Sequence, residues 1–190
     1  MSTQALARSK YESACRRWAG VGPYYAMFPI ACAERVIRRY TDIGDIVLDP
    51  FSGRGTAVFA AAAHDRAGIG VEINPVGYVY TKAKLKPARR NAVEKRIVEL
   101  DKNAWRYRQA AEALPDFFRH CYSQRTRQFL LIARSWLDWQ CNRIDCTTMA
   151  LLLVHLHGKT ASGQTRCQIR CDKQSRCLPS TRCVGGRNGD

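Results

Sequence analysis

The chain has 190 residues, 46% of them hydrophobic, which is enough for one domain with a core of its own. No apolar run reaches the roughly 20 residues of a membrane span, and the first residues lack the apolar core of a secretory signal. We therefore expect a cytoplasmic, intracellular protein with no membrane partner. The formal net charge of +15 favours a polyanionic partner such as a nucleic acid.

The first half of the chain alternates between predicted helices and strands. Residues 1–28 form a polar and aromatic N-terminal segment, and Pro29 then suits the first turn of a helix that continues to Tyr40. Its apolar residues fall at helical spacing. The elements expected next are a buried strand at 46–49, a glycine-rich turn, a helix from Thr56, a strand over 67–73 and a helix from Pro75 towards Leu85.

The second half has a different character. Residues 88–163 are predicted to be mainly helical, with helices over 88–114, 124–139 and 145–157, the first ended by Pro115. Residues 164–190 contain only three aliphatic residues, no aromatic residue and four cysteines. Such a segment buries too little apolar surface to offset its ordering entropy, so we expect a disordered tail.

The most informative stretch is 47–75, which reads strand, glycine-rich turn, helix, strand and acid. That order is typical of the first βαβ unit of a Rossmann-like fold and assigns residues 29–87 to a ligand-binding unit. Asp49 ends the first strand and Glu72 the second, where a carboxylate can accept hydrogen bonds from ribose hydroxyls. Gly53 and Gly55 allow a tight turn and a close approach of a ligand.

The turn also discriminates between cofactors. The dinucleotide fingerprint has a third glycine, which this turn lacks, and it places a pyrophosphate on the helix N-terminus. An acidic residue at the start of the turn would repel a pyrophosphate but can accept hydrogen bonds from an ammonium group. The pattern therefore favours a cofactor with a zwitterionic amino-acid tail.

These residues resemble a known family. The segment DPFSGRGT is similar to the D-P-F-x-G-x-G-T motif of methyltransferases that modify exocyclic amino groups of adenine or cytosine in DNA. GVEINP is similar to the acidic motif that follows, and the Phe-Pro pair before the first helix is similar to an additional motif of the same family. The resemblance implies S-adenosylmethionine as cofactor and DNA as partner, with a fold that is α/β: a partial Rossmann-like βαβ unit, a helical region and a tail.

The resemblance also implies a set of cofactor-binding residues. Glu72 would hold the ribose, Ile73 would pack on the adenine, and the turn would surround the methionine part. Alternative interpretations remain: core packing for Phe28 and Ile73, a solvated acid for Glu72, and a helix cap for Thr56. The full set is Tyr25, Phe28, Pro29, Asp49, Phe51, Gly53, Gly55, Thr56, Glu72 and Ile73.

A dense run of basic residues begins at Lys82. We expect it to contact nucleic acid, the alternative being a solvated helix face. The residues assigned to this role are Lys82, Lys84, Lys86, Arg89 and Arg90.

A second motif of these enzymes, Pro-Pro followed by an aromatic residue, receives the flipped target base. The chain contains no Pro-Pro pair, so no catalytic residue is identified. In the neighbouring reading frame, the degenerate codons of residues 164–190 can encode a string that looks more like a foldable protein and resembles the continuation of this family, so we interpret the tail as a frameshift product. A zinc site at the tail cysteines is a weaker alternative, because their spacing is irregular, and we predict no metal.

The resulting hypothesis is a truncated DNA methyltransferase of this class, weakly active or inactive, whose oligomeric state the sequence does not indicate. The alternatives are a methyltransferase for RNA or a small molecule, and a non-catalytic nucleic-acid-binding module.

Overall fold

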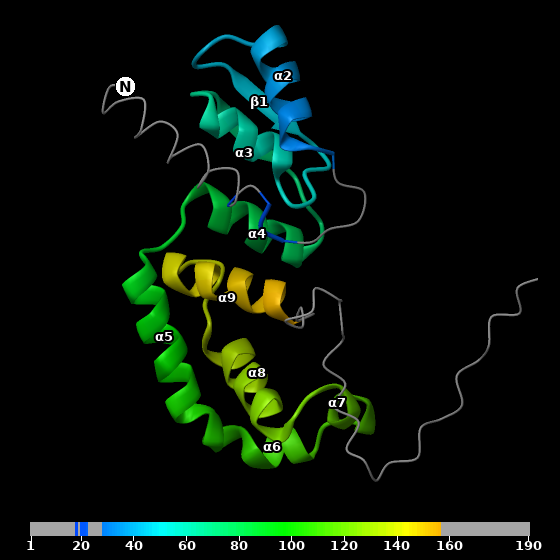
Figure 1. The fold of residues 1–190 in the computed structure, drawn as a ribbon, viewed down its shortest axis with the longest axis vertical. Coiled ribbons are helices and arrows are strands. Elements are labelled where there is room, and N and C mark those ends of the chain that lie inside the picture. The colour runs from blue at the N-terminus through cyan, green and yellow to red at the C-terminus, as the bar shows by residue number, and fades with distance from the viewer. Residues whose placement is uncertain (1–17, 19, 23–27, 157–190) are drawn as a thin grey trace, which may run out of the picture.

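The computed structural model describes residues 18, 20–22 and 28–156. The first elements are α2 (Ile30–Tyr40), β1 (Ile46–Asp49), α3 (Thr56–Ala63), β2 (Ala67–Gly70) and α4 (Pro75–Leu85). Then follow α5 (Arg90–Asn103), the 3₁₀ turn η1 (Ala104–Tyr107), α6 (Arg108–Glu112), α7 (Asp116–Cys121), α8 (Gln124–Trp136) and α9 (Arg143–His155). Figure 1 shows the sheet with α2 and α3 at one end, α4 and α9 in the middle, and α6 to α8 at the other end.

The two strands pair in parallel, with Leu48 opposite Ile69 and Asp49 opposite Gly70. One face of the pair packs closely on α3, because a Cβ atom on Gly68 would lie 2.6 Å from the carbonyl oxygen of Val58. The connection from β1 through α3 to β2 is a βαβ unit, as the sequence predicted, within a helix-rich chain. In the described residues the sheet consists of these two strands.

The second strand is shorter than the predicted 67–73. After Gly70 the chain keeps one more ladder bond, from the Val71 N–H to the Asp49 carbonyl (2.9 Å). The Val71 carbonyl instead accepts from the N–H of Ser52 in the β1–α3 turn (3.0 Å). Glu72 therefore follows the strand rather than ending it, and Asn74 caps the next helix by accepting from the Val76 N–H (2.9 Å).

Helix α2 covers the same side of the sheet as α3. Ala33 and Ile37 pack on Ala60 and Ala61 of α3, with Val47 of β1 against them. Two other apolar positions of the predicted stripe, Val36 and Tyr40, lie in solvent because the small residues of α3 contact only a narrow strip of α2.

The helical region has two buried clusters. In the first, Val79 and Ala83 of α4 pack against Cys146 and Ala150 of α9. In the second, Leu100 of α5 and Ala104 of η1 pack against α8. The predicted helix 88–114 is thus interrupted, since α5 ends at Asn103 and a 3₁₀ turn leads into α6. Helix α8 ends at Trp136 rather than 139, and α9 begins at Arg143.

In the described ranges, no helix combines the length and apolar character needed to cross a membrane. Those ranges also contain no group of three His, Cys, Asp or Glu residues placed to hold a metal ion. Tyr25 and the tail from residue 164 lie outside the described residues.

Candidate cofactor site at the carboxyl edge of the sheet

The turn between β1 and α3 is held by short-range hydrogen bonds. Asp49 Oδ1 accepts from the Phe51 N–H (3.1 Å), and the Ser52 carbonyl accepts from the Gly55 N–H (2.6 Å). The Ser52 hydroxyl donates to the Val71 carbonyl (3.2 Å), which ties the turn to the continuation of β2. The turn is therefore a fixed part of the carboxyl edge, where open α/β sheets bind ligands.

Both glycines of the turn have positive φ, +53° at Gly53 and +76° at Gly55. A Cβ atom on Gly55 would lie 2.4 Å from Thr81 Oγ1 of α4. Because Gly55 has no side chain, α4 can pack against the turn. The sequence alone did not indicate this contact. Thr56 is the buried first residue of α3, and the N-cap position belongs to Gly55, so the helix-cap interpretation of Thr56 does not hold.

The two acids stand at the same edge. Glu72 Oε1 accepts from the Asn74 N–H (2.7 Å), as Asp49 does from Phe51. Within the part of the chain that the structure describes, the second oxygen of each carboxylate has no hydrogen-bond partner. Each acid is thus oriented by one backbone donor.

Large apolar side chains lie beside these acids without being packed. Phe51 is 90% exposed and Ile73 is 99% exposed. The core-packing interpretation therefore fails for Ile73, and Phe28 is also exposed. Pro29 is the exposed N-cap residue of α2.

Arg54, between the two glycines, is a contact that the sequence analysis missed. Its guanidinium donates to the carbonyls of Gly20 (3.2 Å) and Gly22 (3.1 Å), so it joins the turn to the N-terminal segment. Burial lowers the pKa of this guanidinium. The signal that could have pointed to this contact is a charged residue placed between two glycines of the turn.

Lys84 corrects the predicted basic surface. It is only 2% exposed, and its ammonium group donates to the Arg54 carbonyl (3.0 Å). Burial, followed by the positive charge of Arg54, lowers the pKa of Lys84 to about 7. Lys84 lies on the buried side of α4, so it is not available to a nucleic acid. A run of basic residues in the sequence does not by itself show which of their side chains are buried.

The other basic residues of the predicted surface either contact neighbouring residues or extend into solvent. Lys82 donates to the Gln140 carbonyl and lies over the Tyr78 ring, 5.4 Å from its centroid. Arg90 pairs with Glu94 (2.6 Å). Lys86 and Arg89 are exposed.

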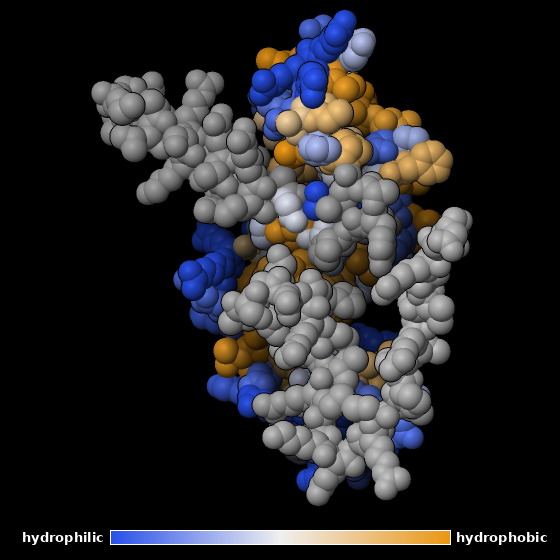
Figure 2. Space-filling view, turned by 45° about the vertical axis from the view of Figure 1, so that its right-hand side comes forward, coloured by the Kyte–Doolittle hydropathy of each residue, from blue (hydrophilic) through white to orange (hydrophobic). Residues whose placement is uncertain are grey.

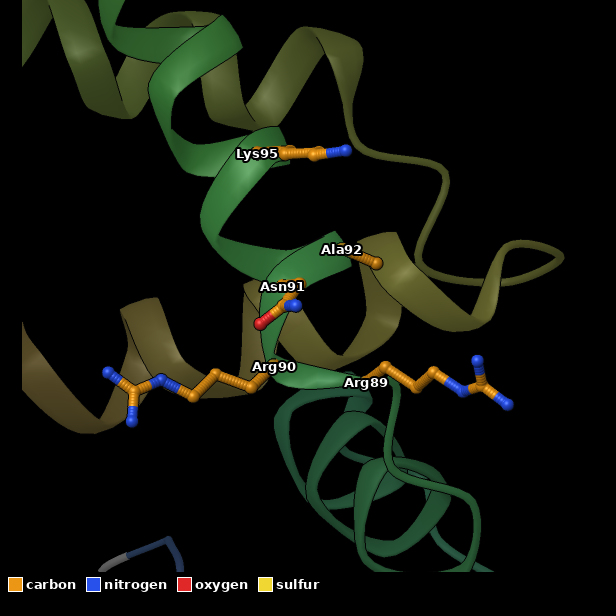
Figure 3. A pocket seen from close by; sticks show the side chains of 5 residues that line it. All are labelled: Arg89, Arg90, Asn91, Ala92 and Lys95. Atoms are coloured by element: carbon orange, nitrogen blue, oxygen red, sulfur yellow. The ribbon is translucent and has the colours of Figure 1, made fainter.

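A shallow hollow lies at the start of α5. Figure 3 shows Arg89 and Arg90 extending in opposite directions there, with Lys95 one turn further along and on the side of Arg89. Asn91 and Ala92 complete the lining. The hollow offers hydrogen-bond donors and positive charge, which suit an anionic group.

Comparison with known proteins gives matches to the N-terminal part of the chain. Residues 3–84 match the family model of the N6/N4 DNA methylases. Three relatives are type II methyltransferases. M.HpaI of Haemophilus parainfluenzae is 46% identical over 52 residues, M.MjaI of Methanocaldococcus jannaschii 51% over 49, and M.MthZI of Methanothermobacter thermautotrophicus 47% over 49.

The N-terminal part of this chain is thus similar to the DNA methylases, a family whose members use S-adenosylmethionine as methyl donor. The aligned segments cover 27%, 26% and 26% of this chain, but only 17%, 16% and 14% of the respective relatives. No solved structure matches.

Proposed function

We propose that the chain provides the S-adenosylmethionine-binding part of a DNA methyltransferase that modifies an exocyclic amino group of adenine or cytosine. The observation that carries this proposal is the carboxyl edge of the β1–β2 pair. Two oriented carboxylates, Asp49 and Glu72, lie there with two almost fully exposed apolar side chains, Phe51 and Ile73. This combination suits a ligand with ammonium, ribose and aromatic parts.

Each group has a separate task in this proposal. The free oxygen of Glu72 accepts hydrogen bonds from ribose hydroxyls, and the exposed Ile73 side chain packs on the adenine ring. Asp49 accepts from the ammonium group of the amino-acid tail, and Phe51 shields that tail from water. The proposed βαβ unit is the start of a Rossmann-like sheet, whose carboxyl edge is its usual ligand site.

S-adenosylmethionine supplies a methyl group on a positively charged sulfur. The residues of this chain would hold that group in a fixed direction, so that an amino nitrogen could attack it in line without a covalent enzyme intermediate. A Pro-Pro-aromatic motif to receive the flipped base is missing from the sequence. The chain by itself is therefore expected to bind the cofactor with weak or no methyl transfer.

Calorimetric titration of the full chain with S-adenosylmethionine tests this proposal. Glu72→Gln is expected to weaken binding about tenfold or more, because a charged hydrogen bond is lost. The matched control is Asp65→Asn, which removes the same charge at the opposite, amino edge of the sheet, just before β2. That variant should bind like the unaltered chain.

Two results would contradict the proposal. If the folded chain binds duplex DNA but not S-adenosylmethionine, it is a nucleic-acid-binding module. If both variants weaken binding equally, the ligand does not lie at the carboxyl edge.

A further inference from the structure

The residues Trp18, Gly20, Val21 and Gly22, here called the anchor segment, lie against α4 (Figure 1). The Val21 side chain packs on the buried cluster that α4 forms with α9. Gly22 has φ +89°, and a Cβ atom there would lie 2.6 Å from the ring of Tyr80 in α4. The anchor segment is therefore seated so closely on α4 that Gly22 admits no side chain unless that ring moves.

Four hydrogen bonds close a ring between the anchor segment, the β1–α3 turn and α4. The Trp18 indole N–H donates to the Lys84 carbonyl (3.1 Å), in the last turn of α4, where carbonyls lack an intrahelical donor. The Lys84 ammonium group donates to the Arg54 carbonyl (3.0 Å). Arg54 Nη1 donates to the carbonyls of Gly20 (3.2 Å) and Gly22 (3.1 Å). Arg54 thus contacts α4 through its backbone and the anchor segment through its side chain.

This arrangement is costly in electrostatic terms. Among the residues that the structure describes, neither Arg54 nor Lys84 has a carboxylate partner, and burial lowers the pKa of both. Their surroundings are apolar in part: Ala83 belongs to the buried α4–α9 cluster, and Figure 2 shows apolar surface at the end of the molecule that carries α2 and the sheet. Charged groups placed at such a cost concentrate at functional sites, which favours a role beyond stability.

We propose that Arg54 is a positioning residue that couples the seating of the anchor segment to the geometry of the β1–α3 turn. Its neighbours Gly53 and Gly55 have few backbone restraints of their own, so the contacts of Arg54 on two sides restrict the middle of the turn. This inference rests on the proposed function, because the turn is where the cofactor would bind. Cofactor affinity should then depend on the anchor segment, and by linkage the bound cofactor should stabilise that segment.

Amide hydrogen exchange of the full chain, followed by NMR, tests the coupling without a ligand. The Val21 N–H donates to the Trp18 carbonyl (3.0 Å) and reports on the anchor segment. The Gly55 N–H donates to the Ser52 carbonyl (2.6 Å) and reports on the turn. Each of these amides is measured in a variant whose substitution lies in the other segment, so a change in exchange has crossed the contact.

Arg54→Met removes the guanidinium donors and should speed exchange at Val21 about fivefold or more. Gly22→Ala displaces the anchor segment from α4 and should speed exchange at Gly55 by a similar factor. The matched control is Gly44→Ala, because Gly44 also has a positive φ (+94°) but open space around it. This control should leave both amides nearly unchanged.

A milder variant covers the case in which Gly22→Ala does not fold. Trp18→Phe keeps an aromatic ring but loses the donor to the α4 carbonyl, and it should also speed exchange at Gly55. Its control is Trp105→Phe, at a residue that is 68% exposed. The proposal is overturned if the distant amides do not respond, or if Gly44→Ala changes them equally.

Calorimetric titration with S-adenosylmethionine extends the test to the proposed site. Arg54→Met and Gly22→Ala should each weaken binding about fivefold or more, and together by little more than the stronger of the two, since both break the same contact. Bound cofactor should slow exchange at Val21. Fully additive losses would assign Arg54 an effect on the turn alone and overturn the coupling.

The two measurements keep the two proposals distinguishable. Coupled exchange in a chain that binds no S-adenosylmethionine supports the role of Arg54 and contradicts the proposed function. Cofactor binding without coupled exchange supports the proposed function and overturns the role of Arg54.

Discussion

The side chains of Lys84 and Arg54 place two positive charges in a partly buried region between α4 and the β1–α3 turn. Lys84 donates to the Arg54 carbonyl, and the Arg54 guanidinium donates to Gly20 and Gly22, while its Nε atom is buried without a hydrogen-bond partner among the described residues. Carbonyl oxygens stabilise both charges less well than a carboxylate would. The protonated form of Lys84 is therefore costly in the folded state.

The stability of the protein should consequently depend on pH through Lys84. Its pKa is lowered from 10.5 to about 7 in the folded chain, so between these values the unfolded chain binds one proton more. The free energy of unfolding should rise with pH across that window, by at most about 1.4 kcal/mol per pH unit. Urea denaturation from about pH 6 to about pH 10 measures this slope.

Lys84→Met should remove this contribution. The control Lys86→Met alters an exposed lysine one residue beyond α4 and should leave the slope unchanged. An unaltered slope in Lys84→Met would assign the pH dependence to another group.

Gly55 combines a left-handed backbone with a close contact to Thr81. Gly55→Ala should destabilise the fold by about 2–4 kcal/mol, because it adds backbone strain and an overlap with α4. Gly44→Ala isolates the backbone part, since Gly44 has φ +94° and open space around it. Urea denaturation should show a smaller loss there, and Thr81→Ala should partly rescue Gly55→Ala but not Gly44→Ala.

At the level of elements, local signals predicted much of the fold. The bounds of the strand Ile46–Asp49 and the helix Pro75–Leu85 agree with the sequence prediction, because glycine, proline and a run of apolar residues mark their ends. The predicted burial of this strand is wrong, since Ile46 is 67% and Leu48 62% exposed. The break of the helix after Asn103 was missed, since it depends on packing against α8. The same holds for the candidate site: the positions of the acids followed from the motif, whereas the contacts of Arg54, Gly55 and Lys84 join distant segments.

Three of the helices are joined by one buried ion pair. Arg96 of α5 donates to Asp145 of α9 (2.8 Å) and to the Trp136 carbonyl at the end of α8 (2.8 Å). Asp145 also accepts from the Asp138 N–H (3.0 Å). Because this carboxylate is buried and serves several donors, its loss leaves them without a partner.

Asp145→Ala is therefore expected to destabilise the chain by about 3–5 kcal/mol. Its control is Glu94→Ala, which breaks the solvent-exposed pair with Arg90 within α5 and should change stability little. Thermal unfolding followed by circular dichroism measures both. Similar losses in the two variants would contradict a special role for the buried pair.

For the molecule as a whole, the dominant property is its excess of positive charge. Phosphate neutralisation releases counterions, so DNA binding by a chain of charge +15 should weaken steeply as salt increases. The exposed residues Lys86 and Arg89 lie between α4 and α5, next to the hollow that Arg89 lines with Lys95. With Arg90, which lines the same hollow and has a side chain that is 86% exposed, they are the exposed residues of the predicted nucleic-acid surface.

Arg89→Ala should lower the slope of log affinity against log salt by about one, as expected when one phosphate contact is lost. Lys84→Met removes a basic side chain at a buried position, and it should leave the slope unchanged. Fluorescence anisotropy with a labelled duplex at several salt concentrations distinguishes them. Equal slopes for both variants would place the DNA elsewhere.

Helix α4 is shared by both halves of the molecule, because it supports the β1–α3 turn on one side and packs on α9 on the other. Because both contacts hold this helix, its backbone amide protons should exchange slowly with deuterium. The amides of β1 lack a second sheet neighbour in the described chain and can open locally. In heavy water, deuterium should therefore enter β1 well before α4, so the β1–α3 turn would have its most persistent support in the helix behind it rather than in the strand from which it emerges.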